Sequence, residues 1–371
     1  MATNRRIFYA VQAVGLAPLG SLTFTNTHGL QTVGITTNYT LENVQEIGQI
    51  SVYQLVEMVP EIEVNLEKKL DGYPLLYHLF TQGSPTATLV GRSAQRTNLA
   101  LSVYGDTQNS ASGTPIAECY ASGLYWSSVN YSFSTEQTLT ETLSAVGNDI
   151  TWATGIAGFT YTPTYNNTDS PLAFAGSGGV QIRRDIIFYP ILGSGDPNYA
   201  KETSSTLDVN GQLSAFLTIL PPDVTGISSS GTNDRNSVGQ YNVHVTQITC
   251  GTNAGRDPLL ELGRKDPFFR FINFPVEVNY SITTLNLLGA GNVASEQGLD
   301  GLGDNVLGRS CKIRVREGTF IDLGTKGKLQ SVTYGGGDAT GGNVLTTYNF
   351  ITYNDFSVTH PQDPSQLPWP Y

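Results

Sequence analysis

The sequence is short of charge, of cysteine and histidine, and of long apolar runs. Charged residues make up 14% of its 371 residues, and the formal net charge is −11. Binding of nucleic acid through its phosphates needs clustered Lys and Arg, so this balance argues against a nucleic-acid-binding protein. It is compatible with DNA that moves past a surface without being held by it.

Membrane spans and disulfides are not expected. No apolar run approaches the roughly 18 residues of a membrane-spanning helix, and the weak apolar stretch near the basic start is interrupted by Gln12. We therefore expect neither a membrane contact nor a signal peptide. The cysteines Cys119, Cys250 and Cys311 lie far apart with no CxxC or Cys/His spacing. They predict reduced, buried thiols in a chain made in a reducing cytoplasm.

Motifs for catalysis, cofactors and metals are also missing. No G-x-S-x-G motif supplies a nucleophile, and the histidines share no spacing; they are His28, His78, His244 and His360. "GAGNVA" (289–294) matches G-x-G-x-x-A only formally, because no parallel strand precedes it and no ribose-binding acid follows. "LDGLGDNVLG" (299–308) lacks the alternating ligands and closing Glu of an EF-hand. We expect no enzyme activity, cofactor or metal, and a structural role for His78 in a helix.

Strand and turn residues are what the chain has in abundance. Forty Gly, 18 Pro and 19 Tyr accompany many Ser, Thr and Asn, a composition typical of a mainly β fold. In "EIEVNLEK" the apolar residues alternate with polar ones, as in a half-buried strand. "LYWSSVNYSFS" and "NVLTTYNFITYNDFSVTH" predict further strands.

Helices are expected to be few and short. "TLENVQEIG" predicts one that begins at Thr40 and ends at Gly48, and "YPLLYHLF", with Pro74 in its first turn, predicts another. Residues 161–239 have loop composition around a strand signal at "GVQIRRDIIFYPI". The Pro-rich residues 361–371 predict an extended arm.

One stretch of the chain resembles another at an offset of 215 residues. "EIGQISVYQLVEMVPEIEVN" (46–65) matches "ELGRKDPFFRFINFPVEVN" (261–279). The positions that define the repeat are Glu46 and Glu261, Gly48 and Gly263, and Pro60 and Pro275. "QTVGITTN" with "VHVTQITCGTN", "SSVNY" with "QSVTY", and the pairs Asn148-Asp149 and Asn354-Asp355 follow in the same order.

These ordered matches predict an internal duplication. Each copy would consist of a short helix, a loop, a strand begun by Pro, and a later pair of long strands, with Asp257-Pro258 at the second helix start. The expected domains are residues 1–165 and 166–360, the second with a loop-rich insertion at about 190–240, followed by the arm at 361–371.

The helix endings "EIG" and "ELG", the Pro-led strands and "VTYGGGDATGGN…TYNDFSVTHP" resemble bacteriophage tail tube proteins. The resemblance implies two tandem β-sandwich or β-barrel domains, each with one or two short helices. It implies rings of three chains (pseudo-hexamers) or six, stacked into a tube that conducts DNA, with other tail proteins as partners. The expected location is the virion tail, after assembly in the cytoplasm of a bacterial host.

Two physical considerations favour the same reading. A strand-rich chain has unpaired sheet edges, and closure into a ring removes them. An acidic wall repels phosphates and lets DNA slide. Glu61, Glu63 and Glu67 alternate outward from the apolar face of their strand and are candidates for the lumen, although a solvated outer face would show the same pattern.

Two alternative functions remain open at the level of the sequence. The chain could be another virion component, such as a distal tail, tail completion or head decoration protein, since these also use β-sandwiches and edge pairing. It could also be a β-rich protein that binds or degrades carbohydrate, because its many aromatic residues would suit stacking on sugars.

Overall fold

The computed structural model describes residues 7, 12–21, 23–82, 84, 88–104, 115–154, 179–187, 245–264, 266–285, 311–315, 317–335 and 342–360. These residues form antiparallel sheets with very little helix, which confirms the predicted mainly β class. The segments 289–294 and 299–308, the whole expected insertion at about 190–240 and the Pro-rich arm at 361–371 lie outside the described residues.

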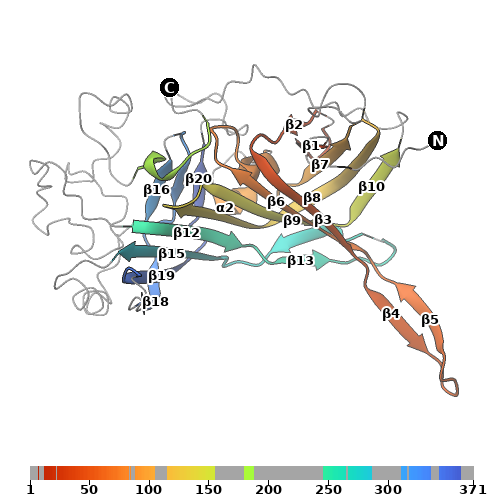
Figure 1. The fold of residues 1–371 in the computed structure, drawn as a ribbon. Helices are drawn as coiled ribbons and strands as arrows, with labels where there is room; N and C mark the ends of the chain where they lie inside the picture. Colours follow the sequence, from red (N-terminus) through yellow and green to blue (C-terminus); the bar gives the residue numbers. More distant parts are fainter. Residues whose placement is uncertain are drawn as a thin grey trace, which may run out of the picture.

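A continuous path of eight antiparallel strands runs through the molecule (Figure 1). Its order is β3-β6-β9-β8-β12-β15-β19-β18. The strands are β3 (Leu30–Asn38), β6 (Glu61–Lys69), β9 (Thr140–Gly147), β8 (Ala117–Ser134), β12 (Val245–Asn253), β15 (Glu277–Leu285), β19 (Leu345–Tyr353) and β18 (Lys328–Gly335). We call the first four strands of this path the first group and the last four the second group.

Each group is backed by further strands. The long strand β8 belongs to two sheets: its residues from Tyr125 onward pair with β9, and those up to Leu124 pair with β7. The sheet on that side consists of β10 (Asp149–Thr154), β8, β7 (Thr97–Val103), β1 (Gln12–Pro18) and β2 (Thr25–Asn26). On the other side lie β11 (Ile186–Ile187), β16 (Lys312–Val315), β17 (Phe320–Asp322) and β20 (Ser357–Thr359).

The apolar core lies between these layers, as the alternation in β6 predicts. Ile62, Val64 and Leu66 are at most 2% exposed, whereas Glu63 and Asn65 on the opposite face are exposed. Burial of such side chains stabilises a fold by about 1.5–3 kcal/mol each. The three cysteines are buried and free, as expected.

The predicted helix at "YPLLYHLF" is confirmed, and it begins after Pro74. Helix α1 (Leu76–Phe80) is buried along its whole length, with His78 bonded through Nε2 to the carbonyl of Val358 at 3.0 Å. A second short helix, α2 (Leu89–Arg92), follows it. The strand signal near residue 186 corresponds to the 3₁₀ turn η2 (Arg183–Asp185) and β11.

The helix predicted from Thr40 to Gly48 is wrong. The segment forms β4 (Leu41–Gln45), which pairs with β5 (Val52–Glu57) in a hairpin. Its apolar spacing suits a helix, but the stretch after the turn is rich in β-branched and aromatic residues, which favour strands. Gly48 has φ +97°, a conformation that a hairpin turn uses as readily as a helix end does.

The helix start predicted at Asp257-Pro258 is also wrong, because this segment too forms a strand that pairs in a hairpin. These residues belong to β13 (Arg256–Leu259), which pairs with β14 (Phe269–Ile272). Both segments are therefore hairpins inserted between paired long strands, β3 and β6 in one case and β12 and β15 in the other.

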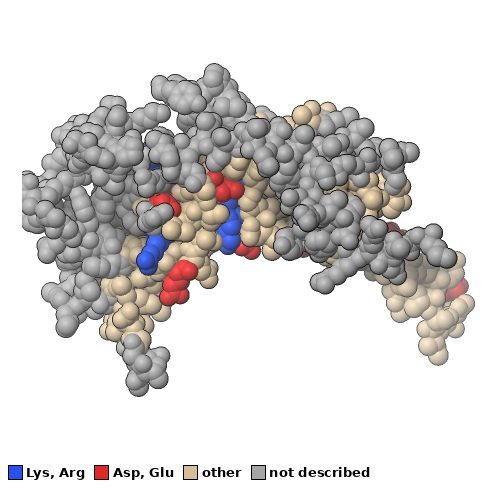
Figure 2. Space-filling model, turned by 45° about the horizontal axis from the view of Figure 1, so that its top comes forward, with Lys and Arg blue, Asp and Glu red and all other residues tan. Residues whose placement is uncertain are grey.

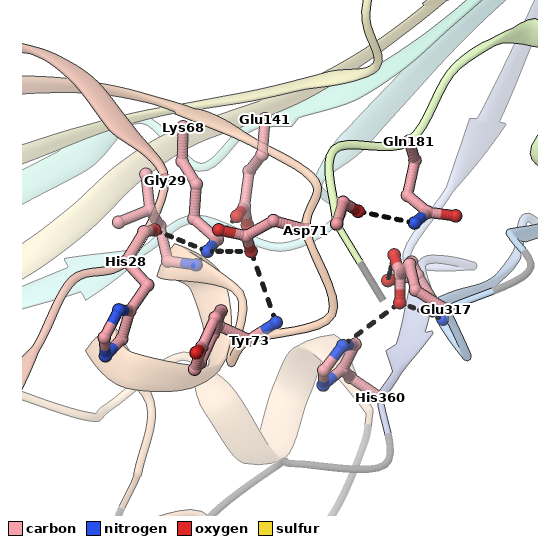
Figure 3. A network of polar contacts seen from close by, with 12 residues as sticks. His28, Gly29, Lys68, Asp71, Tyr73, Glu141, Gln181, Glu317 and His360 are labelled. Atoms are coloured by element: carbon pink, nitrogen blue, oxygen red, sulfur yellow. Dashed lines mark hydrogen bonds and ion pairs between the residues drawn. The ribbon is translucent and has the colours of Figure 1, made fainter. Parts of the chain in front are cut away.

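Buried charged groups fasten α1 to the sheet (Figure 3). Lys68, fully buried, donates from Nζ to Asp71 at 2.7 Å and to the carbonyl of His28 at 2.6 Å. Glu141, also fully buried, accepts from the backbone N–H groups of Leu76 and Tyr77 at the start of the helix. Burial raises the pKa of Glu141, while these hydrogen bonds and the nearby Lys68 act in the opposite direction.

A second buried pair lies close by. Nε2 of His360 is 3.2 Å from a carboxylate oxygen of Glu317 (Figure 3), and both side chains are inaccessible to solvent. Thr319 donates to the same carboxylate from its N–H at 3.0 Å and its hydroxyl at 2.6 Å. Burial by itself would raise the pKa of Glu317, but His360 and Thr319 outweigh it, and the pKa lies below its usual value of 4.5.

This pair predicts a loss of stability in acid. Because the folded-state pKa of Glu317 is depressed, its contribution is present above the unfolded-state value of 4.5 and is lost as pH falls through the folded value. The free energy of unfolding should therefore fall more steeply below about pH 4.5 in the wild-type chain than in a Glu317→Gln variant. Urea titrations in steps from pH 7 to pH 3 measure this slope, with the exposed Glu63→Gln as control. Equal slopes for wild type and Glu317→Gln would contradict it.

Candidate assembly surfaces

The eight-strand path ends in two open edges. Among the described residues β3 pairs only with β6, and β18 only with β19. No residue of either edge strand is fully buried. Because the path contains an even number of antiparallel strands, β3 and β18 run in opposite directions. The β18 edge of one copy can therefore continue, antiparallel, into the β3 edge of another.

The junction between β8 and β12 shows how such edges can meet. It joins the last strand of the first group to the first strand of the second group, in register from Gln247 opposite Ser134 to Asn253 opposite Ser128. The strands on either side follow the same pairing order. The hairpins also correspond, since Leu41 faces Glu57 and Arg256 faces Ile272, an offset of 215 residues on both sides.

A glycine occupies the same ladder position in the first strand of each group. Gly34 lies opposite Asn65, and Gly251 lies opposite Asn279. A Cβ on Gly251 would be 2.6 Å from the carbonyl oxygen of Val129 and would overlap the side chain of Asn130 on β8. A Cβ on Gly34 would meet nothing closer than 3.9 Å. Among the described residues of the single chain, the space beside Gly34 is open.

The face of the eight-strand path that points away from the core is covered with small polar residues. Side chains on neighbouring strands bond to each other across this face. The bonds are Ser144 to Asn65 at 2.6 Å, Thr249 with Ser281 at 2.7 Å, Thr283 with Thr347 at 3.0 Å and Asn349 to Ser331 at 2.9 Å. A surface whose polar groups satisfy one another offers few free donors to a passing ligand.

Charged residues are sparse on this polar face. Alternation places Glu63 and Glu67 of β6 there, as the sequence predicts, with Lys69 at 3.4 Å from Glu67. Glu61 is instead engaged by Arg270 at 2.9 Å. Figure 2, which shows one side of the molecule, likewise has a mostly uncharged described surface, with acidic and basic residues near its middle and acidic atoms near its right-hand end. Among the described residues of this face, no cluster of Lys and Arg resembles a binding site for phosphates.

The residues that define the repeat lie at matching places. At the tip of hairpin β4–β5 the N–H of Gln49 donates to the carbonyl of Glu46 at 3.2 Å, and at the tip of β13–β14 Arg264 donates to Glu261 at 3.4 Å. Gly48 and Gly263 have positive φ in these turns, +97° and +82°. Pro60 and Pro275 stand just before β6 and β15.

Sequence reasoning missed several residues that position these surfaces. They are Gly34, Gly251, Glu141, Arg256 and Arg270. The two glycines had a signal, because "TVGIT" and "TCGTN" fall in matched segments of the repeat. The others had none, since their partners are distant in the chain. In the part of the chain that is described, no cluster of His, Cys, Asp and Glu could hold a metal, and no helix is long and apolar enough to cross a membrane.

No protein-family model and no curated protein matches the chain. Solved structures that match part of it include the tube-terminating cap of the anti-feeding prophage, with 11% identity over 42% of this chain and 95% of that chain and a TM-score of 0.32. A chain from a sheath–tube complex of an extracellular contractile injection system matches with 10% identity over 42% of this chain and 95% of that chain, with a TM-score of 0.28. A chain from the virion of a native gene transfer agent matches with 11% identity over 30% of this chain and 80% of that chain, with a TM-score of 0.20.

Proposed function

We propose that this chain is a structural subunit of a phage-type tail, and within it of the tail tube. Copies would join edge to edge through β18 and β3 into a closed ring, and rings would stack into a hollow tube. The observation that carries the proposal is the β8–β12 junction, which repeats inside the chain the contact that two open edges of opposite direction can make. Closure of the ring would leave neither end of the eight-strand path as an exposed edge.

The internal repeat sets the symmetry of the proposed ring. Residues 1–165 and 166–360 would be two tube-like domains, each contributing one group of four strands to the inner wall. Three chains would then supply six equivalent units in a pseudo-six-fold ring. Matched hairpin registers, matched turns and matched strand order support a duplication as the origin of the two domains.

The polar face of the sheet would line the bore. Its small neutral side chains are bonded to one another, and Glu63 and Glu67 add negative charge. Such a wall would guide DNA without retaining it, because phosphate binding needs clustered cations. The role of the chain would be structural and non-catalytic, in the tail of a virion.

Electron microscopy of the purified chain tests this proposal. We expect rings with six lobes in end views and, at higher concentration, stacked tubes. Single rings that never stack would favour a distal tail, completion or decoration protein, and gel densitometry of virions would then show few copies. A chain that stays a compact monomer at all concentrations would overturn the proposal.

A further inference from the structure

The two hairpins differ in what lies beneath them. Hairpin β13–β14 connects β12 and β15 of the second group. It rests on the N-terminal part of the same chain, on described residues between 12 and 154. Arg256 donates from Nε to the carbonyl of Trp126 at 2.8 Å and from Nη1 to that of Ser93 at 2.7 Å. Its guanidinium also lies 4.9 Å from the ring centre of Tyr125. The hairpin therefore reaches across the β8–β12 junction onto the neighbouring group.

A second arginine completes this attachment. Arg270, which is 5% exposed, donates to the side chain of Asn148 at 3.0 Å and to Glu61 at 2.9 Å. Phe269 beside it packs edge-on against Tyr125, with ring centres 5.4 Å apart. The hairpin base is thus held by two cations that meet carbonyl groups, an amide and one carboxylate.

Among the described residues, hairpin β4–β5 has no such support in its own chain. It projects beyond the body of the molecule, past the end of strand β3 (Figure 1). At the offset of 215 that relates the two ladders, Leu41 takes the place of Arg256, and Leu55 takes the place of Arg270. These two leucines are 57% and 59% exposed. The two leucines stand on one face of the hairpin, and contiguous exposed apolar side chains mark surfaces that bind other molecules.

We call the turn around Pro60 and Asn148 the corner of the first group, and the turn around Pro275 and Asn354 the corner of the second group. The two corners differ in a way that matches the difference between the hairpins. In the N-terminal part the residue after Pro60 is Glu61, the partner of Arg270. In the second group the residue after Pro275 is Val276. The N–H of Val276 donates to the side-chain oxygen of Asn354 at 2.8 Å, whereas the side-chain amide of Asn148 donates to the carbonyl of Pro60 at 2.7 Å. Beside this corner Phe274 and Tyr353 are 46% and 50% exposed. Where the hairpin has Leu in place of Arg, the position that matches Glu61 holds the buried Val276, with Phe274 and Tyr353 beside it and the exposed Glu277 one position further on.

We propose that hairpin β4–β5 of each copy lies across the corner of the second group in the next copy of the same ring, and that Leu41 and Leu55 pack against it. The inference rests on the proposed ring, because it places the hairpin on the copy whose β18 meets its β3. Contacts within a chain would use arginines, whereas contacts between chains would use apolar side chains. That difference favours the correct corner for each hairpin. If hairpin β4–β5 bound the corner of the first group, Leu55 would stand where Arg270 stands, and Glu61 would be left without its charged partner.

A matched pair of variants tests the contact. Leu55 and Val44 are both exposed, but they stand on opposite faces of the hairpin, because Leu55 pairs with Asn43 and Val44 pairs with Gln54. Leu55→Asp should leave the thermal midpoint of the monomer unchanged and raise the subunit concentration for half-maximal ring formation at least about tenfold, since it buries an unpaired charge in the contact. Val44→Asp should change that concentration by less than about twofold, as rim substitutions do.

Hydrogen exchange on single rings and on stacked tubes supplies the second measurement. We expect amides of residues 41–57 to become protected when rings form, before any stacking. Normal rings from Leu55→Asp, or protection that appears only when rings stack, would overturn the proposed contact and leave the ring itself standing. Absence of rings from the wild-type chain would overturn both.

Discussion

A Gly34→Val variant should fold as stably as the wild-type chain and fail to form rings. Gly34 lies on the free edge strand β3, where an added Cβ meets nothing closer than 3.9 Å. In the ring, the backbone of β18 from the next copy would occupy the place that β8 takes beside Gly251. A valine there would collide with that backbone as a side chain on Gly251 would collide with the carbonyl of Val129, 2.6 Å from the Cβ position.

The internal counterpart of this variant should behave in the opposite way. Gly251→Val places the same side chain at the same ladder position, but against a strand of its own chain. We expect it to lower the free energy of unfolding by about 1–3 kcal/mol, the usual cost of an overpacked site. Urea denaturation of both variants measures stability, and sedimentation velocity measures assembly.

The expected pattern is specific to edge pairing. Gly34→Val should remain monomeric at concentrations at least about tenfold above those at which the wild type forms rings, because each interface would lose its strand ladder. The control is Thr151→Val, an exposed position on β10, which lies outside the eight-strand path and outside both hairpins. Rings formed by Gly34→Val at the wild-type concentration would show that β3 is not an assembly edge.

The second large effect is expected at Glu141. Its carboxylate accepts hydrogen bonds from the N–H of Leu76 at 2.7 Å, the N–H of Tyr77 at 3.0 Å and the hydroxyl of Tyr131 at 2.9 Å. Glu141→Ala would leave three buried donors without an acceptor and open a cavity beneath α1. Since each unsatisfied buried group costs about 1–3 kcal/mol, we expect a loss of at least about 3 kcal/mol in the free energy of unfolding.

A conservative variant separates hydrogen bonding from volume at this site. Glu141→Gln keeps the size and one acceptor oxygen but turns an amide N–H₂ toward a backbone donor, so we expect a smaller loss, about 1–2 kcal/mol. Thr142→Ala, on the opposite and exposed face of β9, should change stability by less than about 0.5 kcal/mol. Urea titration measures all three. A loss below about 1 kcal/mol for Glu141→Ala would contradict the anchoring role of this carboxylate.

Local patterns in the sequence determined much of the architecture. The alternation around Ile62 and Val64 predicted a half-buried strand, because a strand presents successive side chains to opposite faces. The segment around His78 predicted a short helix, whose burial only the structure shows, and the mainly β class followed from composition. The acids Glu63 and Glu67 were placed on the polar face by the same alternation, whereas their position in a lumen remains part of the proposed ring.

Only the tertiary structure decided the rest. Leu41, Val44 and Ile47 have helical spacing, yet β4 finds a partner in β5 and forms a hairpin, since strand pairing supplies its hydrogen bonds. Glu61 meets Arg270 from 209 positions away, a contact that no local pattern reveals. Gly34 and Gly251 are alike in sequence, but one stands at an open edge and the other inside a sheet. Partners that are distant along the chain decide which strands are edges, and edges are where this protein can assemble.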